Sequence, residues 1–137
     1  RVSGENVRTK GVDATRVNKN MIEVAKKLAQ KRKCTVVVTG KEDIVACKKK
    51  IYIIKNGHPM MTNIVGTGCM ATSVIGTFAA IEPDLAFASA AALVCFGIAA
   101  ECAAKESSGP GEFKEKIYDC LFHLDKKTID RMQRVEG

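Results

Sequence analysis

Hydrophobic and polar positions follow two different periods in the first half of the chain. From residue 17, apolar residues recur every three or four positions with lysines between them, which predicts an amphipathic surface helix of about 16 residues. Residues 35–38 are continuous and β-branched, so they predict a central strand covered on both faces. Residues 43–47 and 51–55 predict two further short strands, joined by a basic turn. A helix followed by a buried strand is typical of α/β proteins.

The second half is more apolar and predicts helices. Residues 69–81 are apolar nearly all round, so we expect an interior helix. Residues 85–100 carry no charge but are shorter than the roughly 20 residues that span a bilayer. We therefore expect a buried core helix there, capped by Asp84. Apolar residues from 113 to 124 mark one face of a third helix, and residues 128–134 predict a last short one.

The start of the chain predicts less regular structure. Residues 1–13 are predicted to form a loop, because glycines break any period, and Asp13 or Thr15 is expected to cap the first helix. The chain opens with polar and charged residues, without a signal-peptide pattern, and lacks an initiator methionine. We expect a cytoplasmic protein from which an upstream part is missing. No repeat or linker divides the sequence, so we expect one cooperative unit.

Composition narrows the function classes. The 137 residues are 46% hydrophobic and 27% charged, which allows a packed soluble core. The net charge is +7, but aromatic residues make up only 5% and no nucleic-acid-binding motif is present. The basic clusters are therefore interpreted as solvated helix faces and turns, whose field could attract a phosphorylated small molecule. The six cysteines include no C-x-x-C pair, which favours free thiols over a zinc site or a disulfide framework.

One short motif carries candidate chemistry. Gly66, Thr67, Gly68 and Cys69 stand where the first of the apolar helices should begin. Glycines allow a sharp turn and close approach of a ligand, and the first amides of a helix have no intrahelical acceptor. These four residues could form an anion hole for a transferring phosphoryl group. A packing turn is the alternative, and the four residues alone favour it slightly. The motif is not a P-loop, because no lysine follows.

Four segments occur in a recognisable order: "KGVDAT" at residues 10–15, "TVVVTGKED" at 35–43, "NGHPMMTNIVGTGC" at 56–69 and "GPGEF" at 109–113. Together they closely resemble the C-terminal half of the hydroxyethylthiazole kinase family, which belongs to the ribokinase-like superfamily. The resemblance covers essentially the whole chain. "GTGC" is its most specific part, because most ribokinase-like relatives carry aspartate at the cysteine position.

The resemblance implies a ribokinase-like three-layer α/β/α fold, with residues 1–137 as the C-terminal part of a single kinase domain whose N-terminal half is absent. It implies ATP- and Mg²⁺-dependent phosphorylation of the hydroxyl of hydroxyethylthiazole, in thiamine biosynthesis or salvage. It also implies a cytoplasmic homotrimer that binds neither nucleic acid nor membrane. The family's thiazole-binding methionine, ATP-binding arginine and acidic magnesium segment lie in the missing half. We therefore expect no metal ligand in this chain, and incomplete activity from the chain alone.

Three residue roles follow from the resemblance. Gly66 corresponds to a glycine that contacts substrate, Thr39 to a threonine that contacts ATP, and Cys69 to the general-base position. Phosphoryl transfer through a loose transition state does not require a strong base, and helix N-termini lower the pKa of cysteine thiols. We therefore expect the Cys69 sulfur to accept a proton or a hydrogen bond from the alcohol. A buried structural thiol is the alternative.

Other residues give weaker signals. Lys41 stands where the family usually has an acidic residue, while Asp43 matches a later aspartate of the pattern; a solvent-facing turn lysine is the favoured interpretation of Lys41. His58 is expected in a turn, His123 on a helix face and Glu112 at a helix start.

Three other functions stay open. The protein could be a ribokinase-like kinase for another small alcohol, such as a hydroxymethylpyrimidine. It could be a noncatalytic fragment or ligand-binding module. A nucleic-acid-binding domain is the least favoured.

Overall fold

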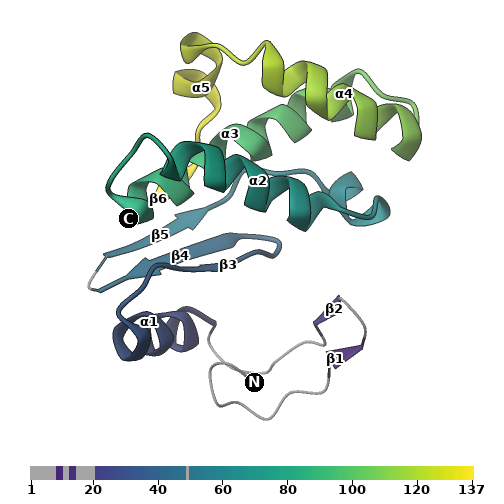
Figure 1. Cartoon of the computed structure of the whole chain (residues 1–137). Coiled ribbons are helices and arrows are strands. Elements are labelled where there is room, and N and C mark those ends of the chain that lie inside the picture. Colours follow the sequence, from purple (N-terminus) through teal and green to yellow (C-terminus); the bar gives the residue numbers. More distant parts are fainter. Residues whose placement is uncertain (1–8, 11–12, 15–20, 49) are drawn as a thin grey trace.

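A four-stranded antiparallel sheet divides the molecule into layers (Figure 1). The computed structural model describes residues 9–10, 13–14, 21–48 and 50–137. The sheet has the order β3-β4-β5-β6, with the bounds β3 Val36–Val38, β4 Asp43–Cys47, β5 Lys50–Ile54 and β6 Val135–Glu136. Two shorter strands, β1 (Thr9–Lys10) and β2 (Asp13–Ala14), pair with each other.

Helices cover both faces of the sheet. The helices are α1 Met21–Arg32, α2 Thr67–Ala79, α3 Leu85–Lys105, α4 Pro110–Phe122 and α5 Lys126–Met132, with a 3₁₀ helix η1 at Pro59–Asn63. In Figure 1, α1 lies against one face, and α3 lies against the other with α2 and α4 packed on it. This arrangement is the three-layer α/β/α architecture that the sequence predicts.

Strand β3 differs from its prediction. It lies at the edge of the described sheet and pairs only with β4 among the described strands, so the prediction of a central strand is wrong there. Its faces are nevertheless both covered: Val37 packs toward the α3 side, while Val36 and Val38 pack with Ala25 and Ala29 of α1. The continuous β-branched run reflects two covered faces, which do not require two neighbouring strands. The predicted strands at residues 43–47 and 51–55 are confirmed, the second starting at Lys50.

Helix α3 is the centre of the core. Its buried residues include Leu93 and Ile98, which form one hydrophobic cluster with Ile54 of β5 and Phe113 of α4. The helix is long and apolar enough to cross a membrane, but 72% of its most apolar window is buried inside the fold. The prediction of a buried core helix is therefore confirmed.

Helix α2 is less buried than its apolar sequence predicts. Only Ala71 is buried, so the prediction of an interior helix is wrong. One side packs against α3, and the other side exposes small or hydroxyl residues, namely Gly68, Cys69, Thr72, Ser73, Gly76 and Thr77. The hydroxyl groups of Thr72 and Ser73 donate to the carbonyl oxygens of Gly68 and Cys69, at 2.8 and 3.0 Å. These hydroxyls are satisfied within the helix, so this face exposes no unpaired hydroxyl of Thr72 or Ser73.

The first helix is only partly described. Its residues from Met21 onward are helical, but Val17 and Thr15 lie outside the described residues. Asp13 is the first residue of β2, which pairs with β1. The prediction of a loop over residues 1–13 is therefore wrong where these strands lie.

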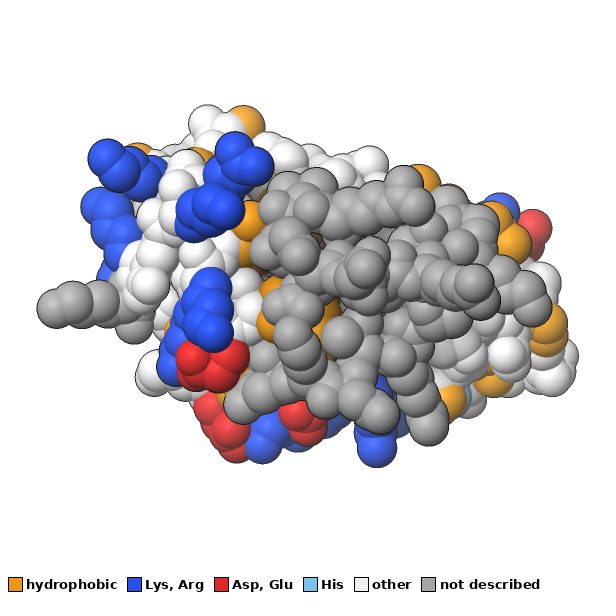
Figure 2. Space-filling model, turned by 90° about the horizontal axis from the view of Figure 1, so that it is seen from below, with side chains coloured by type: hydrophobic (Ala, Val, Ile, Leu, Met, Phe, Trp, Pro, Cys, Tyr) orange, Lys and Arg blue, Asp and Glu red, His pale blue; other side chains and the backbone are white. Residues whose placement is uncertain are grey.

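The basic residues 31–33 at the end of α1 are exposed. Figure 2, which views the molecule from below, shows lysine and arginine side chains gathered at one end of the molecule. The solvated interpretation of this cluster is confirmed.

The C-terminal helices match their predictions closely. Gly109 is the N-cap of α4, Pro110 is its first residue, and Phe113 and Ile117 form its buried face. Helix α5 ends at Met132, slightly earlier than predicted, because the chain then turns to add β6 beside β5. All six cysteines are free thiols, as predicted.

Candidate functional site at the start of helix α2

The predicted anion hole lies at an uncapped helix start. Gly66 is the N-cap of α2 and has a left-handed backbone, with φ 101° and ψ 0°, which favours glycine. The first helical hydrogen bond runs from the Met70 amide to the Gly66 carbonyl, at 2.9 Å, and no side chain caps the helix. Within the described part of the chain, the amides of Thr67, Gly68 and Cys69 therefore have no acceptor. Three such amides, with the helix dipole behind them, form a site suited to an anion.

This turn is open to solvent. Gly68 and Cys69 are exposed, while Gly66 and Thr67 are half-buried. Among the residues that the structure describes, a Cβ placed on Gly66 or Gly68 would meet no atom within 4 Å. Neither glycine is therefore required by packing against a neighbouring segment, which argues against the packing-turn interpretation. Cys69, the third residue of the helix, is not the buried structural thiol considered as its alternative.

The preceding 3₁₀ helix fixes how the chain enters α2. His58 is the N-cap of η1, and its Nδ1 accepts the Met60 amide at 3.3 Å. Met60 and Met61 pack against the core, and the Met61 carbonyl accepts the Thr67 hydroxyl at 3.4 Å. The prediction of His58 as a turn residue is confirmed. The His58 side chain caps η1, and the Met61 carbonyl of η1 bonds to Thr67, the first residue of α2.

Thr39 lies at the same end of the strands as the segment that leads from β5 to α2. Val38 of β3 pairs with Ile44, and Ile44 pairs with Ile53 of β5, so β3 and β5 run in the same direction and end at the same level. Thr39 follows β3 there, and η1 and α2 follow β5 (Figure 1). Ligands of open α/β sheets bind outside the carboxyl ends of such strands. Thr39 is exposed, and no hydrogen bond among the described residues joins it to residues 66–69.

Asp43 organises the turn that carries Thr39. Its Oδ1 accepts the Gly40 amide at 2.9 Å. Burial raises the pKa of Asp43, and the hydrogen bond from Gly40 opposes that rise. Lys41 in the same turn is exposed, which agrees with its interpretation as a solvent-facing lysine.

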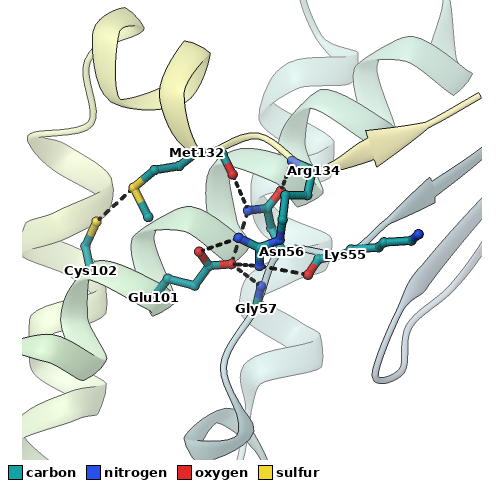
Figure 3. Close-up of polar contacts among 7 residues, drawn as sticks. All are labelled: Lys55, Asn56, Gly57, Glu101, Cys102, Met132 and Arg134. Atoms are coloured by element: carbon teal, nitrogen blue, oxygen red, sulfur yellow. Dashed lines mark hydrogen bonds and ion pairs between the residues drawn. The ribbon is translucent and has the colours of Figure 1, made fainter.

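A polar cluster at the beginning of the segment that leads to this site was missed by the sequence analysis. We call it the Glu101 cluster, and it consists of Asn56, Gly57, Glu101 and Arg134 (Figure 3). In the sequence analysis, Asn56 and Gly57 belong only to a segment that carries the family resemblance, and Glu101 has no assigned role. Asn56 bonds to residues 45 and 78 positions further along the chain, and no periodicity reveals contacts of that length.

The site suits an anionic group better than a free metal ion. Among the residues that the structure describes, no group of three or more His, Cys, Asp or Glu side chains could hold a metal. The amides of residues 67–69 are donors only, so they match phosphate oxygens and would repel a cation.

Comparisons with known proteins agree with this geometry. Residues 1–127 match the hydroxyethylthiazole kinase family. The chain is 46% identical over 136 residues to the hydroxyethylthiazole kinase of Methanosarcina mazei, covering 99% of this chain and 52% of that protein. It is 44% identical over 126 residues to the hydroxyethylthiazole kinase of Chloroflexus aurantiacus, covering 92% of this chain and 47% of that protein.

A solved structure shows the same fold. The hydroxyethylthiazole kinase protein from Pyrococcus horikoshii superposes with a TM-score of 0.81 at 35% identity, covering 85% of this chain and 45% of that one. The chain thus spans about half the length of the relatives that it matches.

Proposed function

The chain belongs to the hydroxyethylthiazole kinase family, and on that premise we propose that the protein transfers the γ-phosphoryl group of ATP to the hydroxyl of hydroxyethylthiazole. In this step the alcohol oxygen forms a bond to γ-phosphorus, the bond from γ-phosphorus to the bridging oxygen breaks, and ADP leaves. The hydroxyl proton passes to the Cys69 thiolate or, where the Cys69 sulfur only orients the hydroxyl, to a phosphoryl oxygen. The product is the phosphate ester of the thiazole alcohol, a precursor of thiamine.

One observation carries this proposal: the uncapped start of α2 leaves three consecutive amides without acceptors among the described residues. Negative charge on a transferring phosphoryl group is stabilised by such donors, because they are already oriented before the reaction. Stabilisation of this kind, together with positioning of the reactants, accounts for most of the catalysis in phosphoryl transfer.

We assign the residues of this turn as follows. The amides of Thr67, Gly68 and Cys69 bind the phosphoryl oxygens, and Gly66 contacts the thiazole alcohol. The Cys69 sulfur accepts the proton of the alcohol or orients its hydroxyl by a hydrogen bond. Support for the Cys69 role comes from its exposure and its place at the third position of α2.

Thr39 is proposed to contact ATP from the end of β3. Its support is the strand register, which puts the ends of β3 and β5 at one edge of the sheet. Mg²⁺ is proposed to enter with the nucleotide phosphates and to neutralise part of their charge, without a ligand set among the described residues. A cytoplasmic homotrimer is proposed from the family alone.

The test is a phosphorylation assay on the whole protein that contains this chain. Purified protein is given ATP, Mg²⁺ and either hydroxyethylthiazole or hydroxymethylpyrimidine, and the phosphate ester is measured by mass spectrometry. The proposal expects the thiazole ester to form and to disappear when EDTA removes the metal. Turnover of the pyrimidine alone would instead establish a kinase for a different alcohol.

A further inference from the structure

The Glu101 carboxylate is the centre of a partly buried polar cluster. Its side chain is only 12% exposed. Its Oε1 accepts hydrogen bonds from the Gly57 amide at 2.8 Å, from Asn56 at 3.1 Å and from Arg134 at 2.7 Å, and its Oε2 accepts a second one from Arg134 at 3.2 Å. Burial acts to raise the pKa of Glu101, but these donors outweigh it and hold that pKa below its ordinary value. The group is therefore a carboxylate at neutral pH.

Asn56 and Arg134 connect this carboxylate to the end of the chain. Asn56 is 5% exposed, its Oδ1 accepts the Arg134 amide at 2.7 Å, and its Nδ2 also donates to the Met132 carbonyl at 2.9 Å. Arg134 also bonds to Lys55, whose amide donates to the Arg134 carbonyl at 2.9 Å and whose carbonyl accepts the Arg134 guanidinium at 3.0 Å. Figure 3 shows that these groups converge from β5, α3 and the segment before β6.

The cluster reaches further than anchoring of the C-terminus requires. The β5–β6 ladder and the bonds between Lys55 and Arg134 already tie the last strand to the sheet. The bond from Gly57 to Glu101 adds nothing to that attachment. Gly57 instead begins the segment that leads through η1 to α2, and its φ of 141° is a backbone conformation that favours glycine.

A continuous series of contacts joins this point to the proposed anion hole. Glu101 holds the Gly57 amide, and the next residue, His58, caps η1. Within η1, the Met61 amide donates to the His58 carbonyl at 3.0 Å, and the Met61 carbonyl accepts the hydroxyl of Thr67. Thr67 is the first residue of α2 and carries one of the open amides.

We propose that Glu101, oriented by Asn56 and Arg134, is a positioning residue that holds η1 and thereby the first turn of α2 in the geometry needed for phosphoryl transfer. The catalytic part of this proposal rests on the proposed function. The positioning part does not, because it concerns only how firmly the backbone from residue 57 to residue 70 is held.

The experiment compares Glu101→Gln and Arg134→Met with Val45→Ala in the whole protein. Val45 is fully buried in β4, so its truncation lowers stability without altering the Glu101 cluster. All proteins are assayed at a temperature where circular dichroism shows each to be folded. Amide hydrogen exchange and steady-state kinetics are measured on the same preparations.

The proposal expects both cluster variants to exchange faster over residues 57–70 and to lose kcat roughly 10- to 100-fold, with KM for the alcohol nearly unchanged. Val45→Ala should leave both quantities as in the unmodified protein, apart from general destabilisation. Faster exchange confined to residues 132–137, with kcat retained, would overturn the proposal and leave a C-terminal anchor. Equal kcat losses in Val45→Ala would also overturn it. If the unmodified protein lacked kinase activity, the proposed function would fail, and the exchange measurement would still decide the positioning part.

Discussion

Helices α2 and α3 are neighbours of similar composition, yet their N-termini are built differently. Helix α3 begins with Asp84, whose carboxylate accepts the amides of Ala86 and Phe87 at 3.1 and 3.2 Å. Helix α2 begins with Gly66, which has no side chain to offer, and the described residues supply no other acceptor. A carboxylate cap stabilises a helix, so its absence from α2 gives up stability at that position. The difference teaches that one helix start is closed by a residue of the fold itself, while the other leaves its amides open to the phosphoryl group that we propose binds there.

The glycines of the two helices also differ in how much space surrounds them. A Cβ on Gly97 of α3 would lie 2.7 Å from the backbone of Asn56, whereas a Cβ on Gly68 or Gly76 of α2 would meet nothing within 4 Å in the described part of the chain. Glycine in α3 allows two segments to approach closely. Glycine at the start of α2 leaves space that the described residues do not fill.

The largest effect is expected when a negative charge is placed at the open start of α2. Gly68→Asp adds a carboxylate among the amides of residues 67–69, where it favours the helix but repels phosphate. We expect kcat/KM to fall at least about 10³-fold while the thermal midpoint is unchanged or higher. Gly68→Ala is the matched control and should lose less activity. Retention of activity by Gly68→Asp would show that the phosphoryl group binds elsewhere.

Removal of the thiol should have the next largest effect. Cys69→Ala is expected to lower kcat by about 10- to 10³-fold, because a general base assists a loose transition state only in part. Since Cys69 is exposed, the thermal midpoint should not change. Single-turnover kinetics and calorimetry on the same sample measure both. A complete loss in a folded protein would indicate covalent catalysis, and no loss would make the sulfur a bystander.

Gly97→Ala tests the closed region. Because the new methyl group would overlap the Asn56 backbone, we expect destabilisation of about 1–3 kcal/mol. Gly76→Ala in α2 is the matched control; its Cβ meets open space, so it should raise stability by up to about 1 kcal/mol. Urea unfolding gives both values. The same sign for the two substitutions would contradict the contrast between the helices.

The smallest expected effect concerns the α3 cap. A hydrogen bond from Lys50 at 2.6 Å, with the Phe87 amide next in importance, lowers the pKa of Asp84. A lowered folded-state pKa means that the stabilisation is present above about pH 4 and is lost as the pH falls through the folded-state value.

Asp84→Ala should therefore lower the thermal midpoint by a few degrees at pH 7 and by less at pH 3, with kcat at pH 7 unchanged. Calorimetry across this pH range measures the gap between the two proteins. A gap that stays constant with pH would show that the charge of Asp84 is not what stabilises α3.

Local signals in the sequence predicted much of the fold. Asp84 as a cap, Glu112 at the start of α4 and the buried stripe of Phe113 and Ile117 are all short-range features, and all are confirmed. Hydrophobicity alone misjudged α2, because threonine and serine hydroxyls can bond to their own helix and face solvent. It also misjudged β3, because covered faces do not determine how many strands lie beside it.

The candidate site also has one part that local sequence signals indicate and one part that they do not. A glycine turn at a helix start was predictable for residues 66–69, because glycines there constrain the backbone locally. The four residues alone slightly favoured a packing turn, so the openness of this turn had to come from the structure. The Glu101 cluster was not, because its geometry depends on where β6 returns to the sheet beside β5. The position of Thr39 level with the end of β5 likewise could be known only from the strand register.

The most direct measurement is an NMR spectrum of the backbone amides of the whole protein, bound to hydroxyethylthiazole and to an ATP analogue that cannot transfer its phosphoryl group. The account predicts downfield shifts and slower exchange for the amides of Thr67, Gly68 and Cys69, with Ala86 and Phe87 at the capped start of α3 unchanged. Unshifted amides at residues 67–69 under saturating ligand would contradict it.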